Sequence, residues 1–150
     1  MLDNQIFEPE KLSLIEFKLI KGQVDTPEDF NLDNVKEYLL ENSLQLAFNL
    51  EEKLVKADFS IEIKTKNDGE NSKEASGIFH LVYIYRVENL DELVRPNKNK
   101  ILDLHQDLSN AISAVTYSTS RGILITRLQG TALQNFVLPI INPNKLVHKN

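Results

Sequence analysis

The sequence predicts an α+β domain in which a four-stranded antiparallel sheet is covered on one face by a single long helix. Three observations support this class: three segments alternate apolar and polar residues and a fourth is apolar on both faces, one later segment has helical spacing, and the strands precede the helix. The 150 residues suit one domain that spans the whole chain, 1–150. We expect residues 1–11 and 145–150 to be loose ends.

The strands are predicted from apolar residues at every second position. Residues 12–24 form the first, with Ile15, Phe17 and Leu19 on one face. A turn at Thr26–Asp29 and a short helix over residues 33–41 are expected next, so that the second strand begins at Ser43.

The third and fourth strands have the strongest patterns. Apolar and polar residues alternate strictly over residues 55–63, which indicates a strand with one buried face and one solvent-exposed face. A polar hairpin connection over residues 67–77 opens with Asn-Asp-Gly. Residues 78–87 carry apolar side chains on both faces, so this strand is expected in the centre of the sheet or covered on its second side.

The long helix is predicted over residues 101–122. Asn97 or Asn99 is the expected cap and Gly122 the expected stop. Its buried face is predicted from the apolar residues at helical spacing: Ile101, Leu104, Leu108, Ile112 and Val115.

The C-terminal part is expected to pack on these layers. Residues 130–138 look like a short helix, and the segment 138–143 contains Pro139 and Pro143. Proline cannot enter a central strand, so we expect this extended apolar segment to lie across the helix or along the sheet edge.

Composition narrows the functional classes. The chain has no cysteine, no signal-peptide pattern and no apolar run that could span a membrane, so we expect a cytoplasmic protein. Its net charge of −5 divides into −9 over residues 1–97 (11 Lys/Arg, 20 Asp/Glu) and +4 over residues 98–150 (6 against 2). The acidic part argues against nucleic acid as the main partner.

Motifs for catalysis or cofactor binding are absent from the sequence. The three histidines, His80, His105 and His148, lack the spacing of metal ligands, and no nucleotide-binding or nucleophile motif occurs. Asp103 and Asp107, four residues apart, fit a solvated pair better than a shared proton or a cation site. We therefore expect no enzyme activity, no cofactor and no metal.

Several segments in order resemble the SecB family of export chaperones. They are Val24–Pro27 after the first strand, Tyr85–Leu90 after the fourth, Ser120–Gly122 in the long helix and the Leu-Pro-Ile-Ile-Asn-Pro segment at 138–143. The resemblance covers residues 12–146. It implies sheets paired into dimers, dimers joined through helices into a tetramer, and binding of unfolded chains in apolar grooves for protein export, without ATP or catalysis.

The resemblance also suggests partners. Asp25 matches one acid of the family's docking pair for the export motor SecA, whereas Lys21 stands at the other position. SecB-like proteins also include chaperones of toxin–antitoxin systems, so SecA and a toxin–antitoxin protein are both candidate partners.

Two sets of residues are candidates for binding. A peptide groove is predicted at Phe30, Tyr38, Tyr83, Tyr85, Phe136 and Leu138. Ordinary core positions are the alternative. A contact between subunits is predicted at Ser109, Ser113, Thr116 and Arg121. A solvated helix face, with Arg121 capping its own helix, is the alternative.

The leading hypothesis is therefore a chaperone for unfolded or partly folded polypeptides. Its main alternative is a dedicated partner of one specific protein, such as an antitoxin. An enzyme of an uncharacterised α+β family is a third class, and it would need a polar cleft with clustered acids or histidines.

Overall fold

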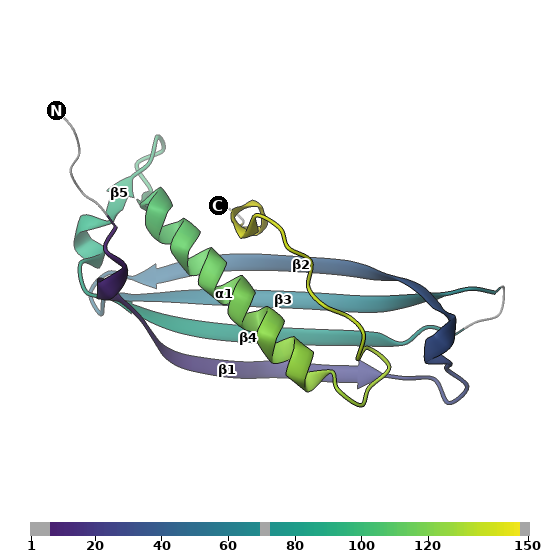
Figure 1. The fold of residues 1–150 in the computed structure, drawn as a ribbon. Helices are drawn as coiled ribbons and strands as arrows, with labels where there is room; N and C mark the ends of the chain where they lie inside the picture. The colour runs from purple at the N-terminus through teal and green to yellow at the C-terminus, as the bar shows by residue number, and fades with distance from the viewer. Residues whose placement is uncertain (1–6, 70–72, 148–150) are drawn as a thin grey trace.

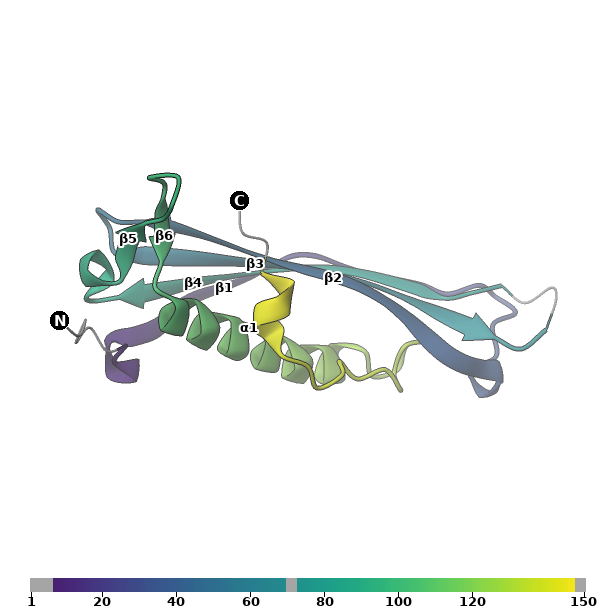
Figure 2. The same ribbon diagram turned by 90° about the horizontal axis from the view of Figure 1, so that it is seen from above.

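Four long antiparallel strands and one long helix form two layers in the computed structural model, which describes residues 7–69 and 73–147 (Figure 1). The sheet has the order β1-β4-β3-β2. Helix α1 (Gln106–Arg127) crosses one face of the sheet obliquely, and the other face is left open (Figures 1 and 2). The predicted α+β fold class is confirmed. The strands are β1 (Leu12–Asp25), β2 (Val35–Asn49), β3 (Leu54–Asn67) and β4 (Ser76–Val87).

The strand order is that of a Greek key. Strands β2, β3 and β4 follow one another as neighbours, and β1 lies beside β4 at the far edge. The connection from β1 to β2 therefore crosses the end of the sheet, where the short 3₁₀ turn η2 (Leu32–Asn34) is capped by the Asn31 side chain. Both β1 and β2 are edge strands of this sheet.

The predicted alternation of β3 and the predicted central position of β4 are confirmed. Every second residue of β3 from Val55 to Thr65 is buried toward α1, and the intervening side chains are polar and more exposed. In β4 the residues that face α1 are also buried, and Val82 on the opposite face is buried as well. These two strands carry most of the hydrophobic core, which explains why the fourth segment is apolar on both faces.

Strand β1 is an irregular edge. Its register with β4 shifts between Leu14 and Glu16 and again between Leu19 and Lys21, so that Ile15 and Ile20 are bulged residues. These two side chains are 47% and 55% exposed. The bulges therefore interrupt the regular ladder and leave apolar side chains accessible at the sheet edge.

The prediction of a short helix over residues 33–41 is wrong. Apart from the three-residue turn η2, this stretch is the first half of β2, which begins at Val35 and not at Ser43. Its residues pair with the far end of β3, with Leu40 opposite Ile63 and Val35 opposite Asn67. A bulge between Val35 and Glu37 breaks the alternation in the sequence, and cross-strand pairing outweighs the local helical pattern.

The helix begins and ends about five residues later than predicted. Residues Leu102–Leu104 form strand β6, which pairs with β5 (Val94–Pro96), and neither Asn97 nor Asn99 caps the helix. His105 is the cap, and its Nδ1 accepts a hydrogen bond from the Asp107 backbone N–H at 3.1 Å. The helix continues through Gly122 to Arg127, and Gly130 supplies the positive φ of the following turn.

The buried face of α1 differs from the predicted one in composition. Leu108 and Ile112 are buried as predicted, whereas Ile101 and Val115 are exposed, the latter by 41%. The remaining buried positions of α1 include three small hydroxyl residues that an apolar pattern overlooks: Ser113, Thr116 and Ser120. The helix thus packs against the sheet through a mixed apolar and hydroxyl face.

The segment after α1 turns back and runs beside the helix toward β2 (Figure 1). Residues 130–138 form turns and not the predicted short helix, and the first of these turns packs on the end of β4. A side chain at Gly77 would place a Cβ only 2.6 Å from Leu133 Cδ1, so the glycine permits this packing. The extended segment from Leu138 then leads to the 3₁₀ turn η4 (Pro143–Leu146), which contacts both α1 and β2 (Figure 1).

Substitution of Leu108 tests the assignment of the buried helix face. Leu108→Asp places an unpaired carboxylate in the core, and we expect a loss of about 3–5 kcal/mol in the free energy of unfolding. Val115→Asp, on the exposed side of the same helix, is the control and is expected to change it by less than about 1 kcal/mol. Equal chemical denaturation midpoints for the two variants would contradict the assignment.

Candidate functional site

A pair of buried hydrogen bonds joins α1 to the middle of the sheet. The Tyr83 hydroxyl lies 2.6 Å from Ser120 Oγ, and the Tyr85 hydroxyl lies 2.8 Å from Thr116 Oγ1. Both tyrosines are almost fully buried, and burial raises their pKa values, that of Tyr85 to about 12. The hydroxyl residues of α1 therefore satisfy polar groups that would otherwise be stranded in the core.

The C-terminal half of α1 holds the chain that runs beside it. Arg121 donates from Nε to the Leu138 carbonyl at 3.0 Å and from a terminal nitrogen to the Pro139 carbonyl at 3.2 Å. The Tyr117 hydroxyl donates to the same Pro139 carbonyl at 2.5 Å. The Arg121 guanidinium also lies over the Tyr117 ring. These contacts fix the start of the extended segment on the helix.

Helix α1 divides its face of the sheet into two parts. On the β1 side there is a cavity of about 530 Å³ between the strand and the helix. Phe17 of β1 and residues of α1 line it, and the Phe17 ring packs against Tyr83 with centroids 5.1 Å apart. The lining residues from α1 are Ser118, Thr119, Gly122, Ile123, Thr126 and Arg127. This groove is open and mostly apolar.

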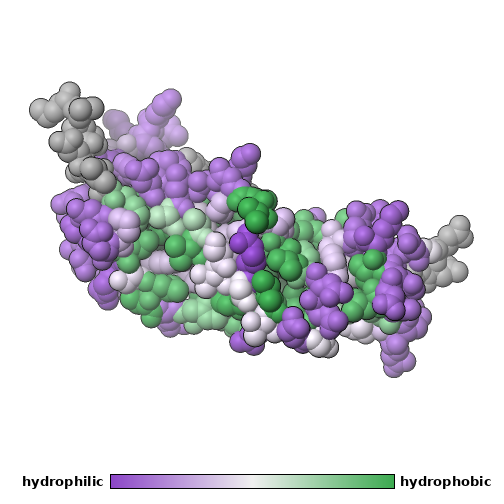
Figure 3. Space-filling view, viewed as in Figure 1, coloured by the Kyte–Doolittle hydropathy of each residue, from purple (hydrophilic) through white to green (hydrophobic). Residues whose placement is uncertain are grey.

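On the β2 side the C-terminal segment covers the sheet. Tyr38 of β2 packs edge-on against Phe136, with ring centroids 5.4 Å apart. Farther along the same strand, Leu146 and Val147 pack against the core as partly buried residues. Figure 3 shows hydrophobic side chains gathered over the middle of this face, whereas hydrophilic ones dominate both ends.

The predicted groove residues lie in two places. Tyr38 and Phe30 are partly buried, and Phe136 and Leu138 are buried where the C-terminal segment meets the sheet and helix. Tyr83 and Tyr85 lie beneath α1, where a peptide reaches them only if the helix moves. The structure thus brings Tyr38 and Phe136 together and keeps the other two tyrosines in the core.

The predicted subunit-contact residues do not form one exposed surface. Ser113 and Thr116 are fully buried against the sheet, and Arg121 binds the segment of its own chain that runs beside the helix. Ser109 is partly buried and accepts through its carbonyl from the Ser113 hydroxyl. The exposed side of α1 instead presents other residues, several of them small: Ala114, Val115, Ser118, Gly122 and Ile125.

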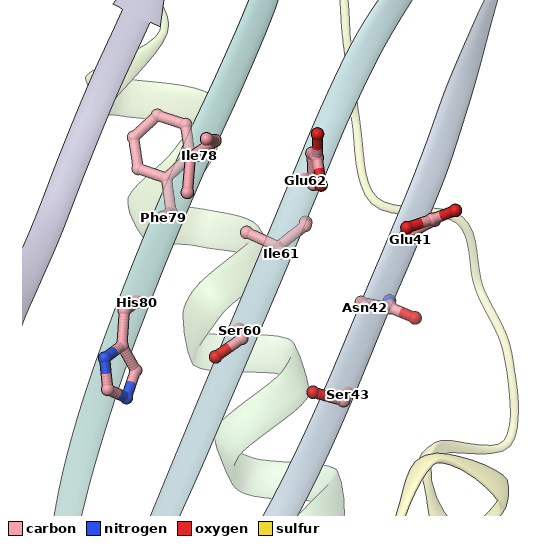
Figure 4. Close-up of a pocket in the computed structure, with 9 residues that line it drawn as sticks. All are labelled: Glu41, Asn42, Ser43, Ser60, Ile61, Glu62, Ile78, Phe79 and His80. Atoms are coloured by element: carbon pink, nitrogen blue, oxygen red, sulfur yellow. The ribbon is translucent and has the colours of Figure 1, made fainter.

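The opposite face of the sheet has a shallow hollow of about 350 Å³ across β2, β3 and β4 (Figure 4). His80 Nε2 lies 2.9 Å from Asp58 Oδ1, and Asp58 also pairs with Lys56 at 3.4 Å. On the same face Glu41 and Glu62 are cross-strand partners at the edge of the hollow. This face is a ladder of partly exposed charges, mostly in pairs of opposite sign.

The candidate acid and histidine residues are spread over several elements. Within residues 7–69 and 73–147, no group of three or more histidine, aspartate or glutamate residues could hold a metal ion. His80 lies on β4 and His105 caps α1, while His148 lies outside the described residues. Asp103 lies on β6 and Asp107 in the first turn of α1, both exposed. Asp25 is exposed at the end of β1, where it accepts a hydrogen bond from Gln23 at 2.8 Å.

This arrangement can bind a ligand through apolar side chains and through the edges of the sheet. The groove beside β1 is lined mainly by aliphatic, aromatic and hydroxyl side chains, and an extended peptide is held by such pockets together with backbone hydrogen bonds. None of the helices among the described residues has the length and hydropathy needed to cross a membrane.

Comparisons of fold identify a neighbour among solved structures. No family model and no curated protein sequence matches the chain. The SecB-like chaperone Rv1957 of Mycobacterium tuberculosis, solved with a ChAD peptide from the Rv1956 HigA1 antitoxin, aligns with a TM-score of 0.63 and 13% identity over 88% of this chain and 91% of that chain. A protein of unknown function from Streptococcus agalactiae aligns with a TM-score of 0.34 and 12% identity over 86% and 97% of the two chains. The chain therefore has the fold of a SecB-like chaperone.

The raised tyrosine pKa values predict a loss of stability at high pH. The unfolded chain releases the Tyr85 proton near pH 10 and the folded chain near pH 12, so the stabilisation is complete below pH 10 and is lost as the pH rises toward 12. We expect the melting temperature to fall between about pH 9.5 and 11, and to fall less steeply in Tyr85→Phe. Tyr38→Phe, nearer the surface, is the control and should keep most of the slope. Identical slopes for native protein and Tyr85→Phe would contradict this expectation.

Proposed function

We propose that this protein is a SecB-like chaperone that holds unfolded or partly folded polypeptides by apolar contact, without ATP and without catalysis. The observation that carries the proposal is the incomplete cover of the sheet by α1. One apolar groove beside β1 is open, and the β2 side is covered only by the chain's own C-terminal segment. A chaperone of this fold was solved with a bound peptide, which supports the proposal.

Binding alone is sufficient for such a function. A protein that binds the unfolded chain and not the folded one shifts the folding equilibrium by mass action and delays aggregation. The client segment would lie on the β2 side, where the partly buried Phe30 and Tyr38 provide apolar contacts and the buried Phe136 and Leu138 form part of the supporting core. We place the protein in the cytoplasm, where newly made chains destined for export are unfolded.

Aggregation of a denatured protein tests this function. Chemically denatured citrate synthase is diluted with and without a molar excess of the protein, in the absence of ATP, and light scattering is recorded. We expect scattering to be suppressed. The Tyr38→Asp variant should lose most of this protection, because it places a charge where the client's apolar side chains would bind.

Leu39→Asp is the matched control for this substitution. Leu39 is the next residue of β2, 52% exposed on the opposite face of the sheet, so its variant should protect like the native protein. Both variants are first checked for native melting temperatures. Unchanged aggregation in the presence of native protein, or equal protection by the two variants, contradicts the proposed function or its site.

We also propose that the protein acts as a homo-oligomer, a dimer or a tetramer. Strand β1 leaves one edge unpaired in the described chain and exposes Leu14, Ile15 and Ile20, which favours association with another copy. The mass of the protein in solution tests this part. A strict monomer at micromolar concentration contradicts it and leaves the aggregation test unaffected.

A dedicated role with one partner is the second candidate function. The peptide bound to Rv1957 comes from an antitoxin, and this observation favours a toxin–antitoxin partner over SecA. In addition, the acid at Asp25 has Lys21 nearby on the same strand, which weakens an acidic docking surface. A stable one-to-one complex with a single antitoxin, combined with no protection of citrate synthase, would favour this candidate over a general chaperone.

A further inference from the structure

We propose that the C-terminal segment 142–147 is a built-in competitor that occupies the β2 side of the binding surface and must leave before a polypeptide binds there. This inference rests on the proposed function, because it concerns access to the same surface. The segment follows α1 in the chain and returns to the sheet between α1 and the free edge of β2 (Figures 1 and 2).

The segment reaches the sheet edge at one point, its last residue. Val147 forms an isolated parallel bridge with Leu44, in the middle of β2. Because β3 occupies the other edge of β2, this bridge lies on the edge that a bound peptide would use. Leu146 and Val147 also pack against the hydrophobic core as partly buried side chains. The chain's own residues thus make both kinds of contact that hold an extended peptide.

The segment is held much less firmly than the chain that precedes it. Phe136 and Leu138 are buried, and three hydrogen bonds from Tyr117 and Arg121 fix the carbonyls of Leu138 and Pro139. Beyond this anchor Ile140 is 91% exposed, so the chain leaves the surface before it returns. The hydrogen bonds described for the Asn144 and Lys145 backbone N–H groups stay within the segment, both accepted by Asn142.

This division predicts local release without unfolding of the domain. The anchor at Leu138 and Pro139 fixes the chain where it leaves α1. A short stretch that includes the exposed Ile140 separates this anchor from the partly buried side chains of Leu146 and Val147. Regions with few buried apolar contacts open at low free-energy cost, whereas the anchored part opens only with the core. The segment can therefore leave the β2 edge while α1 and the sheet remain in place.

The affinity for an added peptide should depend on how often the segment is released. A tethered segment acts at an effective concentration of the order of millimolar, and the apparent dissociation constant of a competitor rises in inverse proportion to the released fraction. Loosening the segment is thus expected to strengthen peptide binding. Fixing it in place is expected to abolish binding.

The test uses the full chain and a fluorescent peptide with the sequence of residues 140–147, IINPNKLV, followed by fluorescence anisotropy. The double variant L146N/V147N removes the apolar contacts of the segment, and we expect it to bind this peptide at least tenfold more tightly than native protein. The control is Ile140→Asn, which replaces an exposed aliphatic residue by asparagine just before the segment and should bind like native protein.

A second variant tests the opposite direction. The chain has no cysteine, and paired neighbouring strands bring their Cα atoms within disulfide range, so L44C/V147C permits one engineered bridge. The oxidised form should lose peptide binding, and the same sample after reduction should regain it. Equal peptide affinities of native protein and L146N/V147N, or of the oxidised and reduced forms, would overturn the proposal.

The proposed chaperone function and the proposed competitor role can be contradicted independently of each other. If L146N/V147N gains affinity for the peptide but the native protein does not protect citrate synthase, the competitor is supported and the general chaperone function is contradicted. If native protein protects citrate synthase and the oxidised L44C/V147C variant protects equally well, clients bind elsewhere and the competitor is contradicted.

Discussion

The structure depends on burying a sheet that is wider than the helix that covers it. Strands lie about 4.8 Å apart, so the axes of β1 and β2 are about 14 Å from each other before their side chains are counted, whereas a helix with side chains is about 10–12 Å across. Helix α1 crosses the sheet obliquely and, together with the turns at residues 130–138, covers β3 and β4, whose inward residues are buried from Val55 to Thr65 and from Gly77 to Val87. Most inward side chains of the two edge strands, Leu44 excepted, are only partly buried, and these are the surfaces available to other polypeptides.

The sequence predicted most of this architecture because period-two alternation reports directly on a sheet with one buried face. It failed where long-range pairing decides the conformation. Residues 35–41 have a local helical pattern, yet pairing with β3 makes them a strand, and residues 102–104 pair with β5 before the helix begins. Gly122 is the predicted end of the helix, but the helix continues through it to Arg127. A Cβ at this position would meet no atom within 4 Å, so the glycine lies on the outward side of the helix and no turn forms there.

The candidate site was harder to predict than the fold. Tyr83 and Tyr85 belong to a strand and Thr116 and Ser120 to a helix, and only the crossing of the two layers pairs each phenol with a small hydroxyl. The sequence does show a run of hydroxyl residues in the helix. The spacing of apolar residues alone does not indicate that some of these hydroxyl groups face the sheet. Likewise the prolines predicted an extended crossing segment, whereas the bridge between Val147 and Leu44 depends on where β2 begins and ends.

The two bulges of β1 limit how this edge can be extended. Regular pairing along a strand requires an unbroken register, and here only four residues separate Ile15 from Ile20. A foreign strand can therefore match a short window before its alternation falls out of phase and its apolar side chains turn to the wrong face. An edge of this kind accepts a partner of defined length and resists open-ended growth into fibres.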